Sequence, residues 1–179
     1  MHMPPPIPFL PDKPVVLVGL MGVGKSSIGK RLAARLHLPF VDADHEIEQA
    51  ADLSISEIFE RFGEPYFRDG EARVIARLLA GAPKVIATGG GAFMHPRTRT
   101  QILKSAHTCW LDAEIDVLAE RVARKSHRPL LNGRDAKTVL ADLASLRTPV
   151  YALAPIHIKS TKGPPDMIVD QIIEKLRHA

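Results

Sequence analysis

Gly19-Leu-Met-Gly-Val-Gly-Lys-Ser26 joins the apolar run of residues 15–18 to a helical pattern over residues 28–36. A strand, a glycine-rich loop and a helix in this order are typical of a nucleotide phosphate loop. The glycines let backbone N–H groups approach phosphate oxygens, and the positive end of the following helix adds its field. The stretch therefore predicts a bound Mg-NTP, with a turn that binds nothing as the alternative.

Two side chains of this loop carry the expected chemistry. Lys25 supplies a mobile positive charge for the outer phosphates, and the Ser26 hydroxyl is a suitable ligand for Mg²⁺. The residues of the loop expected to contact the nucleotide are Gly22, Val23, Gly24, Lys25, Ser26 and Ser27.

Length and composition narrow the class of protein. The chain has 179 residues, which suits one domain, and its 45% of hydrophobic residues suffice for a three-layer core. The only cysteine, Cys109, lies in an apolar run and is expected to be a buried strand thiol rather than a nucleophile. No apolar run approaches the length of about eighteen residues that a membrane span needs. We therefore expect a cytoplasmic protein with no membrane partner.

Residues 1–14 hold six prolines and no long apolar core, so they fit neither a signal peptide nor a membrane span. We interpret them as an N-terminal extension of a single domain that spans residues 15–179. The formal net charge of +4 is too small to indicate nucleic acid by itself, but basic residues gather over residues 121–134. This cluster predicts a mobile lid that closes over phosphates, with a solvated charged face as the alternative. Its members are Arg121, Arg124, Lys125, His127, Arg128 and Arg134.

Short apolar strands alternate with longer amphipathic helices along the chain. Strands are expected at residues 15–18, 40–41, 85–87, 108–111 and 156–158. Helices are expected near residues 25–36, 44–51, 56–62, 65–80, 96–104, 113–124, 135–148 and 165–178. Strands separated by helices predict an α/β fold with a parallel sheet and helices on both faces. Ligands bind at the carboxyl ends of such strands, where the phosphate loop, Asp42, Gly89 and Asp112 fall.

Two pairs of charged residues follow the second strand. Asp42 and Asp44 come directly after it and can serve Mg²⁺ and a substrate hydroxyl; the alternative is that Asp44 only caps the next helix. Arg68 and Glu71 lie three residues apart on a predicted helix, so Glu71 can hold the guanidinium in place. An ion pair exposed to solvent is the alternative for this second pair.

The third strand ends in Gly89-Gly-Gly91, a run that neither a hairpin nor a helix interior favours. We expect a ligand to approach the backbone N–H groups of these glycines, with an ordinary turn as the alternative. Further along, Arg128-Pro-Leu-Leu131 is the candidate tip of the lid. Arg147 comes shortly before Pro149, and we expect that proline to end or kink its helix.

Six segments, taken in their order along the chain, resemble the shikimate kinase family. They are Gly19-Leu-Met-Gly-Val-Gly-Lys-Ser26, Phe40-Val-Asp-Ala-Asp44, Phe67-Arg68, Gly89-Gly-Gly91, Arg128-Pro-Leu-Leu131 and Arg147-Thr-Pro-Val-Tyr151. The resemblance implies three α/β/α layers around a five-stranded parallel sheet of the nucleoside-monophosphate-kinase type. It also implies that ATP, with Mg²⁺ as cofactor, phosphorylates the 3-hydroxyl of shikimate on the route to chorismate and aromatic amino acids.

The resemblance implies roles for the residues on the nucleotide side. Lys25 would contact the transferred phosphate, and Arg128 would reach the phosphates from the lid. Arg121 would stack on adenine. Ser26, with Asp42 through water, would hold Mg²⁺.

The resemblance also implies roles on the acceptor side. Asp44 would accept a hydrogen bond from the attacking hydroxyl, so that the catalytic residues would be Lys25, Asp44 and Arg128. Arg68 and Arg147 would grip the shikimate carboxylate, which suits the bidentate geometry of guanidinium groups. The backbone of Gly89, Gly90 and Gly91 would surround the ring.

The chain departs from the family pattern after Tyr151. Ala154-Pro155 stand where the family usually has an alanine followed by an acidic residue, so we expect the preceding helix to end early. We also expect residues 160–163, on the adenine side, to be shaped differently. The histidines show no spacing typical of metal ligands, and Trp110 is expected in the core rather than as a stacking platform.

Three other functions stay open. A gluconate kinase shares the loop and the sheet, but would not explain Asp44, Arg68, the glycine run and Arg147 together. A regulatory module would bind ATP without phosphorylating a small molecule. A nucleic-acid NTPase is disfavoured because the basic residues cluster at the lid instead of forming an extended stripe with aromatics. We expect a monomer that binds shikimate and ATP but no nucleic acid.

Overall fold

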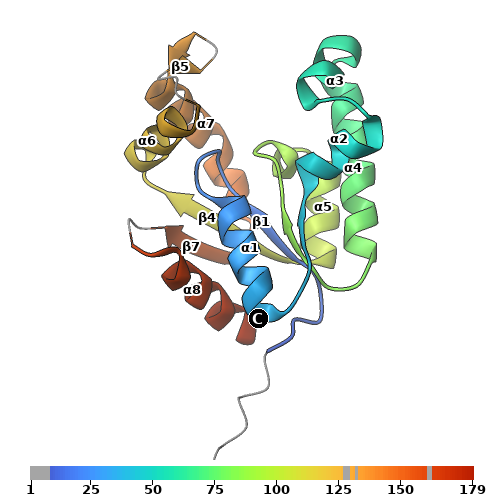
Figure 1. Cartoon of the computed structure of the whole chain (residues 1–179), viewed down its shortest axis with the longest axis vertical. Helices are drawn as coiled ribbons and strands as arrows, with labels where there is room; N and C mark the ends of the chain where they lie inside the picture. The colour runs from blue at the N-terminus through green and yellow to red at the C-terminus, as the bar shows by residue number, and fades with distance from the viewer. Residues whose placement is uncertain (1–8, 127–129, 132, 161–162) are drawn as a thin grey trace, which may run out of the picture.

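The computed structural model describes residues 9–126, 130–131, 133–160 and 163–179. Five parallel strands form one sheet in the order β2-β3-β1-β4-β7 (Figure 1). Their bounds are β1 Val15–Val18, β2 Phe40–Asp42, β3 Val85–Ala87, β4 His107–Ala113 and β7 Ile156–Ser160. The predicted α/β fold with a five-stranded parallel sheet is confirmed.

Helices cover both faces of this sheet. In Figure 1, α1 (Lys25–Leu36) and α8 (Pro165–Arg177) pack together on the near face. On the far face, α5 (Pro96–Ser105) packs on β4 beside α4 (Glu64–Ala80).

Two arms rise above the carboxyl ends of the strands in Figure 1. One arm comprises α2 (Ala43–Ala51) and α3 (Ile55–Phe62), and the other comprises α6 (Ile115–Ser126) and α7 (Ala136–Tyr151). The other described elements are the 3-10 turn η1 (Ala92–Met94) and the antiparallel pair β5 (Leu130–Leu131) and β6 (Arg134–Asp135).

The centre of the core is β1, whose four residues have no exposed surface. Parallel strands inside a three-layer fold are covered on both faces, which explains the unbroken apolar run. Cys109 is fully buried on the neighbouring strand β4, so the prediction of a buried strand thiol is confirmed. This burial raises the pKa of the thiol to about 12. Trp110 is also buried, as predicted for a core residue, and it stacks on His157 with ring centroids 4.0 Å apart.

Of the two effects expected of Pro149, an end or a kink of its helix, the end near residue 148 is wrong. The helix α7 continues to Tyr151, and the amide of Ala152 still donates to the carbonyl of Thr148 across 2.9 Å. A proline so close to the end removes one helical hydrogen bond, while Tyr151 gains a buried position against the sheet. The helix ends at Tyr151, before Ala154-Pro155.

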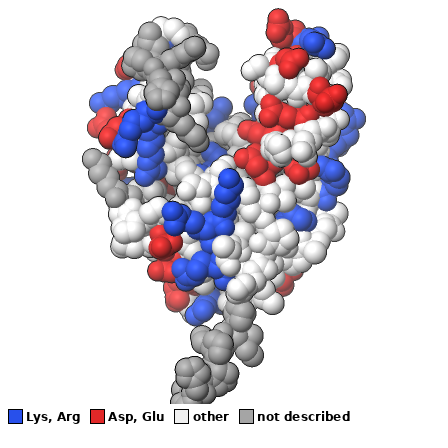
Figure 2. All heavy atoms as spheres, viewed as in Figure 1, with Lys and Arg blue, Asp and Glu red and all other residues white. Residues whose placement is uncertain are grey.

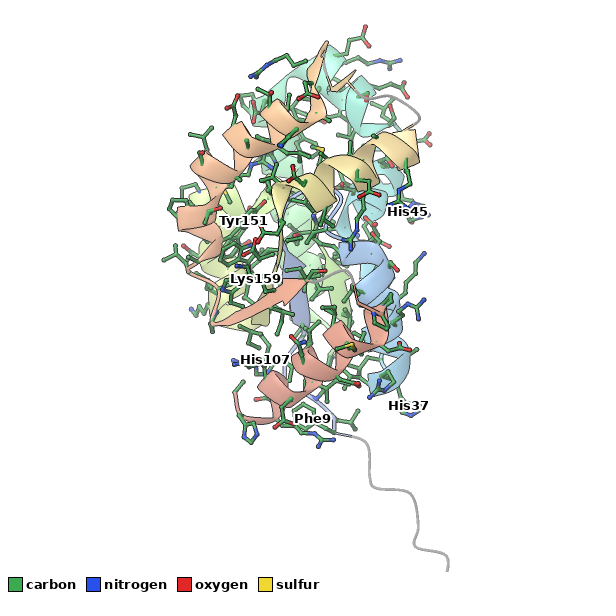
Figure 3. The ribbon with its side chains drawn as sticks, turned by 90° about the vertical axis from the view of Figure 1, so that its left-hand side faces the viewer. Phe9, His37, His45, His107, Tyr151 and Lys159 are labelled. Carbon is green, nitrogen blue, oxygen red and sulfur yellow. The ribbon has the colours of Figure 1, made fainter. Side chains whose placement is uncertain are left out.

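The positions of the histidines and the lengths of the helices bear on whether the chain binds a metal ion or spans a membrane. His37 and His45 lie exposed at the outer edge of the molecule (Figure 3). Among the described residues, no group of three or more His, Cys, Asp or Glu side chains is placed to hold a metal ion. In the same part of the chain, no helix combines the length and the apolar character needed to cross a membrane.

Candidate active site

A cleft of about 610 Å³ lies between the two arms, at the carboxyl ends of β1, β2 and β3. Figure 2 shows the hollow between the arms, with acidic side chains gathered over one of them. The cleft is lined by the phosphate loop, the end of β2 with the start of α2, the start of the glycine run, and α6. The sheet therefore brings together the segments that the sequence places at strand ends.

Lys25 is held inside the phosphate loop. Its ammonium donates to the carbonyl oxygens of Gly19 at 2.6 Å and Leu20 at 3.1 Å. Burial lowers the pKa of Lys25 to about 8, although the nearby carboxylate of Asp44 opposes the shift. Gly24, with φ of 96°, begins α1 in the left-handed region that favours glycine. The loop thus presents a cation and the amino end of a helix to the cleft.

Asp42 uses its two carboxylate oxygens for different partners. Its Oδ1 accepts hydrogen bonds from the amides of Asp44 and His45, at 3.0 and 3.2 Å, and so caps α2. Its Oδ2 accepts from the Ser26 hydroxyl at 3.0 Å. The alternative in which Asp44 caps this helix is wrong, because Asp42 does so. The paired hard oxygens of Ser26 and Asp42, which face the cleft beside the phosphate loop, fit Mg²⁺, which takes few protein ligands and keeps several waters.

Asp44 lines the cleft, and its side chain does not cap α2, because Asp42 is the capping residue. Burial raises the pKa of its carboxyl, and the neighbouring Asp42 raises it further, while Lys25 opposes both effects. A half-buried carboxylate beside a cation is a strong acceptor for a hydroxyl donor.

Each glycine of the run Gly89–Gly91 faces a different polar side chain. A Cβ atom on Gly89 would lie 2.6 Å from Oδ1 of Asp44, and one on Gly90 would lie 2.9 Å from Nη1 of Arg147. A Cβ atom on Gly91 would overlap Nη2 of Arg68. None of the three has a positive φ, so space rather than backbone conformation requires glycine here. The alternative of a turn is partly confirmed, because Gly90 and Gly91 lie in a turn closed by a hydrogen bond from the Ala92 amide to the Gly89 carbonyl at 3.2 Å. The missing side chains also make room for three charged groups, and the approach of a ligand to this backbone stays a prediction.

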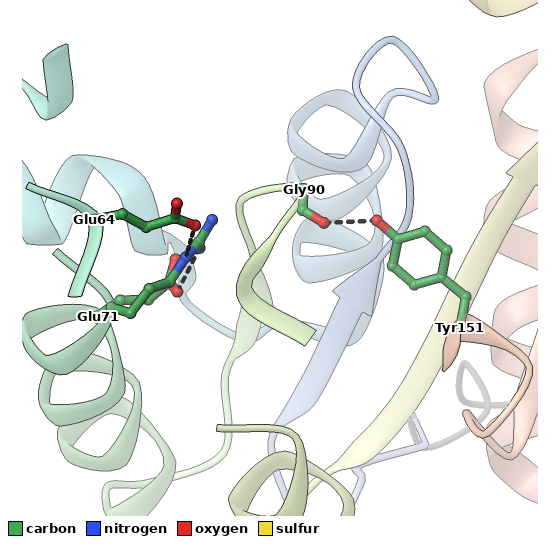
Figure 4. A network of polar contacts seen from close by, with 5 residues as sticks. Glu64, Glu71, Gly90 and Tyr151 are labelled. Atoms are coloured by element: carbon green, nitrogen blue, oxygen red, sulfur yellow. Dashed lines mark hydrogen bonds and ion pairs between the residues drawn. The ribbon is translucent and has the colours of Figure 1, made fainter. Parts of the chain in front are cut away.

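Arg68 and Glu71 form the expected pair, in which the carboxylate is buried and the arginine side chain is 20% exposed. Nη1 of Arg68 donates to Oε1 of Glu71 at 2.8 Å, and the Glu71 side chain is only 1% exposed (Figure 4). Burial raises the pKa of Glu71, while the hydrogen bond from Arg68 opposes the rise. Nε of Arg68 also lies 3.5 Å from the exposed carboxylate of Glu64. The alternative of a solvent-exposed ion pair is therefore wrong.

Arg121 lies on α6 beside the phosphate loop. Its Nη1 donates to the carbonyls of Gly22 and Val23, both at 3.3 Å. A second hollow of about 280 Å³ adjoins it, bounded by Ser27, Ser160 and α8. Arg128 and part of the predicted adenine-side segment, residues 161–162, lie outside the described residues.

Tyr151 and Thr88 reach the site without a predicted role. The Tyr151 hydroxyl donates to the Gly90 carbonyl at 2.6 Å, and the Thr88 hydroxyl donates to the Leu17 carbonyl at 2.8 Å beneath the glycine run. Tyr151 could have been found from its place four residues after Arg147, which puts both on one face of a helix. Thr88 carries no signal beyond its place at the end of a strand.

Comparison with known proteins identifies relatives of this chain. Residues 21–177 match the family model described as shikimate kinase. A protein named shikimate kinase from Zymomonas mobilis subsp. mobilis is 54% identical over 90% of this chain and 92% of its own length. One from Bradyrhizobium diazoefficiens is 58% identical over 91% of this chain and 79% of its own length.

A solved structure agrees with these relatives. Shikimate kinase from Acinetobacter baumannii, in complex with shikimate, matches with a TM-score of 0.85 at 33% identity and 94% coverage of each chain. The family model, the two relatives and this structure agree, and the chain belongs to the shikimate kinase family.

Proposed function

We propose that this enzyme transfers the γ-phosphoryl group of ATP to the 3-hydroxyl of shikimate, yielding 3-phosphoshikimate and ADP. The observation that carries the proposal is the meeting of the phosphate loop with Asp44, Arg68 and Arg147 around one glycine run. A phosphate loop alone suits many NTPases, whereas two arginines and a carboxylate suit an acceptor that is both an acid and a polyol. The shikimate bound in the A. baumannii relative supports this choice of acceptor.

The nucleotide half of the proposed site is the phosphate loop with Arg121. Residues 22–27 would surround the phosphates, and Arg121 would stack on the adenine. Lys25 would give up its hydrogen bonds to the loop carbonyls and donate instead to the transferred phosphoryl group. The negative charge of the phosphate favours this exchange because it stabilises the charged ammonium. We assign Mg²⁺ to Ser26, with Asp42 acting through water. The metal would neutralise charge on the β- and γ-phosphates.

The acceptor half comprises Asp44, the two arginines and the glycine run. Arg68 and Arg147 would bind the carboxylate of the acceptor from two sides, and the glycine backbone would lie against its ring. Asp44 would accept a hydrogen bond from the attacking hydroxyl and so orient it. The transition state of phosphoryl transfer is loose, so this alignment matters more than removal of the proton by a strong base.

Charge neutralisation completes the proposed mechanism. Lys25 and Arg128 would stabilise the negative charge on the transferred group, with Arg128 reaching it from the lid over residues 121–134.

We assign the kinase domain to residues 15–179 and the first fourteen residues to an extension. We further propose a monomer and a cytoplasmic location, where ATP is supplied.

The direct test is ADP release from the purified protein with MgATP. Shikimate, gluconate, quinate and no acceptor are compared in parallel, and Lys25→Ala is the matched inactive variant. A rate that depends on shikimate and is abolished in Lys25→Ala supports the proposal. A rate of ADP release that depends only on gluconate would identify gluconate, and not shikimate, as the acceptor. A rate that is the same with every acceptor and without one would favour an NTPase or a regulatory module.

A further inference from the structure

Tyr151 lies one helical turn after Arg147, and its side chain is buried between the end of α7 and the sheet (Figure 3). Its ring centroid lies 5.9 Å from that of Trp110 and 6.4 Å from that of Phe93. Its hydroxyl donates to the Gly90 carbonyl across 2.6 Å (Figure 4). The hydroxyl therefore ties the glycine run to the end of α7, across 61 residues of sequence.

Arg147 approaches the same glycine from the same helix. A Cβ atom on Gly90 would lie 2.9 Å from its Nη1, so a side chain there would displace the guanidinium. Within the described residues, Arg147 forms no ion pair with an acidic side chain, whereas Arg68 is held by Glu64 and Glu71. An arginine without a carboxylate from the protein keeps its charge for an anionic ligand, but something else must hold it in place.

The Tyr151 hydroxyl is suited to that task because it stays protonated. Burial raises the pKa of Tyr151, and the charge of Arg147 opposes the rise only in part. At neutral pH the group is therefore a constant donor. Loss of the hydroxyl would leave the Gly90 carbonyl without its donor in a partly buried place.

We infer that Tyr151 is a positioning residue for the acceptor: its hydroxyl fixes the Gly90 backbone relative to the Arg147 guanidinium, where the acceptor carboxylate binds. The inference rests on the proposed function. The nucleotide end has anchors of its own, since Lys25 bonds to the carbonyls of Gly19 and Leu20. The effect of the hydroxyl is thus confined to acceptor binding.

The test compares Tyr151→Phe with Tyr66→Phe. The first removes the hydroxyl and keeps the buried ring. The second removes the hydroxyl of the only other tyrosine, which is 51% exposed and stacks on Phe62. Both variants are assayed for kcat, for the KM of shikimate and of ATP, and for thermal unfolding.

For Tyr151→Phe we expect the KM for shikimate to rise about tenfold, as the loss of one hydrogen bond implies. We expect kcat and the KM for ATP to change less than about twofold, since neither depends on this bond. Tyr66→Phe should match the wild type in every constant. An unchanged KM for shikimate in Tyr151→Phe would overturn the inference, and so would equal losses in all three constants, which indicate a purely structural role.

A binding measurement separates this inference from the proposed function. Trp110 is the only tryptophan and packs on the Tyr151 ring, so its fluorescence can follow a titration with shikimate in the absence of ATP. If the wild type neither binds nor phosphorylates shikimate, the proposed function fails and the inference fails with it. If the wild type does both and Tyr151→Phe binds shikimate equally well, only the inference fails.

Discussion

Arg68 donates to the buried carboxylate of Glu71 across 2.8 Å, one turn further along α4. Removal of the Glu71 carboxylate leaves the half-buried Arg68 guanidinium with only the exposed carboxylate of Glu64, 3.5 Å away. We expect Glu71→Ala to lower the free energy of unfolding by about 1–2 kcal/mol and to raise the KM for shikimate, because Arg68 loses its nearest partner. Urea unfolding and initial rates measure the two effects.

Glu64→Ala is the matched control for this pair. Glu64 lies 3.5 Å from the same arginine, but its side chain is 64% exposed, so the expected change is below about 0.5 kcal/mol. Equal destabilisation by the two substitutions would contradict the role assigned to the buried pair.

Asp44→Asn should separate activity from stability. We expect the rate to fall by roughly 10²-fold, because the hydroxyl of the acceptor loses its orienting partner. Burial and Asp42 raise the pKa of Asp44, so the charged form costs folding free energy above that pKa, and the neutral amide avoids the cost. The melting temperature of the variant should therefore equal or exceed that of the wild type at pH 7.

The stability difference between Asp44→Asn and the wild type should shrink as the pH falls through the raised pKa, where Asp44 itself becomes neutral. Glu46→Gln, on the same helix and paired with Arg77, is the control for charge removal outside the cleft. Near-normal turnover of Asp44→Asn would refute the orienting role.

Lys25 should take up protons when ATP binds. Its folded pKa of about 8 lies below the ordinary 10.5, so its charged form costs stability below pH 8, and that cost fades as the pH rises toward 10.5. Bound phosphate favours the charged form, so near pH 8 binding should draw protons from the buffer. Calorimetry in two buffers of different ionisation enthalpy measures this uptake.

Two lysine variants of α1 control that measurement. Lys25→Met should abolish the uptake, and Lys30→Met, which changes an exposed lysine of the same helix, should preserve it. Uptake that persists in Lys25→Met would assign the proton to another group.

Gly91→Ala should damage acceptor binding while Gly70→Ala should not. A methyl group on Gly91 would overlap the Arg68 guanidinium, which Glu71 holds in place, so we expect kcat/KM for shikimate to fall about 10²-fold. Gly70 lies in α4 with no atom near its potential Cβ, so alanine there should stabilise the protein by up to about 1 kcal/mol. Kinetics and thermal unfolding of both variants test this contrast, and a fully active Gly91→Ala would contradict it.

Local patterns predicted most of the fold. The strand Val15–Val18 and the helix Lys25–Leu36 begin and end where the apolar run and the glycine loop place them. The pairing of Arg68 with Glu71 was equally accessible, since residues three apart share a helix face. Such features depend only on neighbours in the chain, and the sequence displays those directly.

Contacts between distant segments could not be predicted in this way. The bond from Tyr151 to Gly90 and the contacts that pair each glycine with a charged side chain depend on how three elements meet in space. The helix end near Pro149 was predicted wrongly because helix propensity is a local property. It does not include the free energy that Tyr151 gains when its side chain is buried against the sheet. The part of Arg128 in the reaction lies outside the described residues and stays a prediction.

The two carboxylate oxygens of Asp42 have different partners, and this connects the nucleotide side of the cleft with the acceptor side. One oxygen accepts a hydrogen bond from the Ser26 hydroxyl, and the other caps the helix on which Asp44 lies two residues later. If Ser26 binds Mg²⁺ as proposed, a shift of the Asp42 side chain toward the metal would also change the cap of the helix that carries Asp44. The proposed magnesium site and the proposed partner of the acceptor hydroxyl are thus joined through a single side chain, that of Asp42.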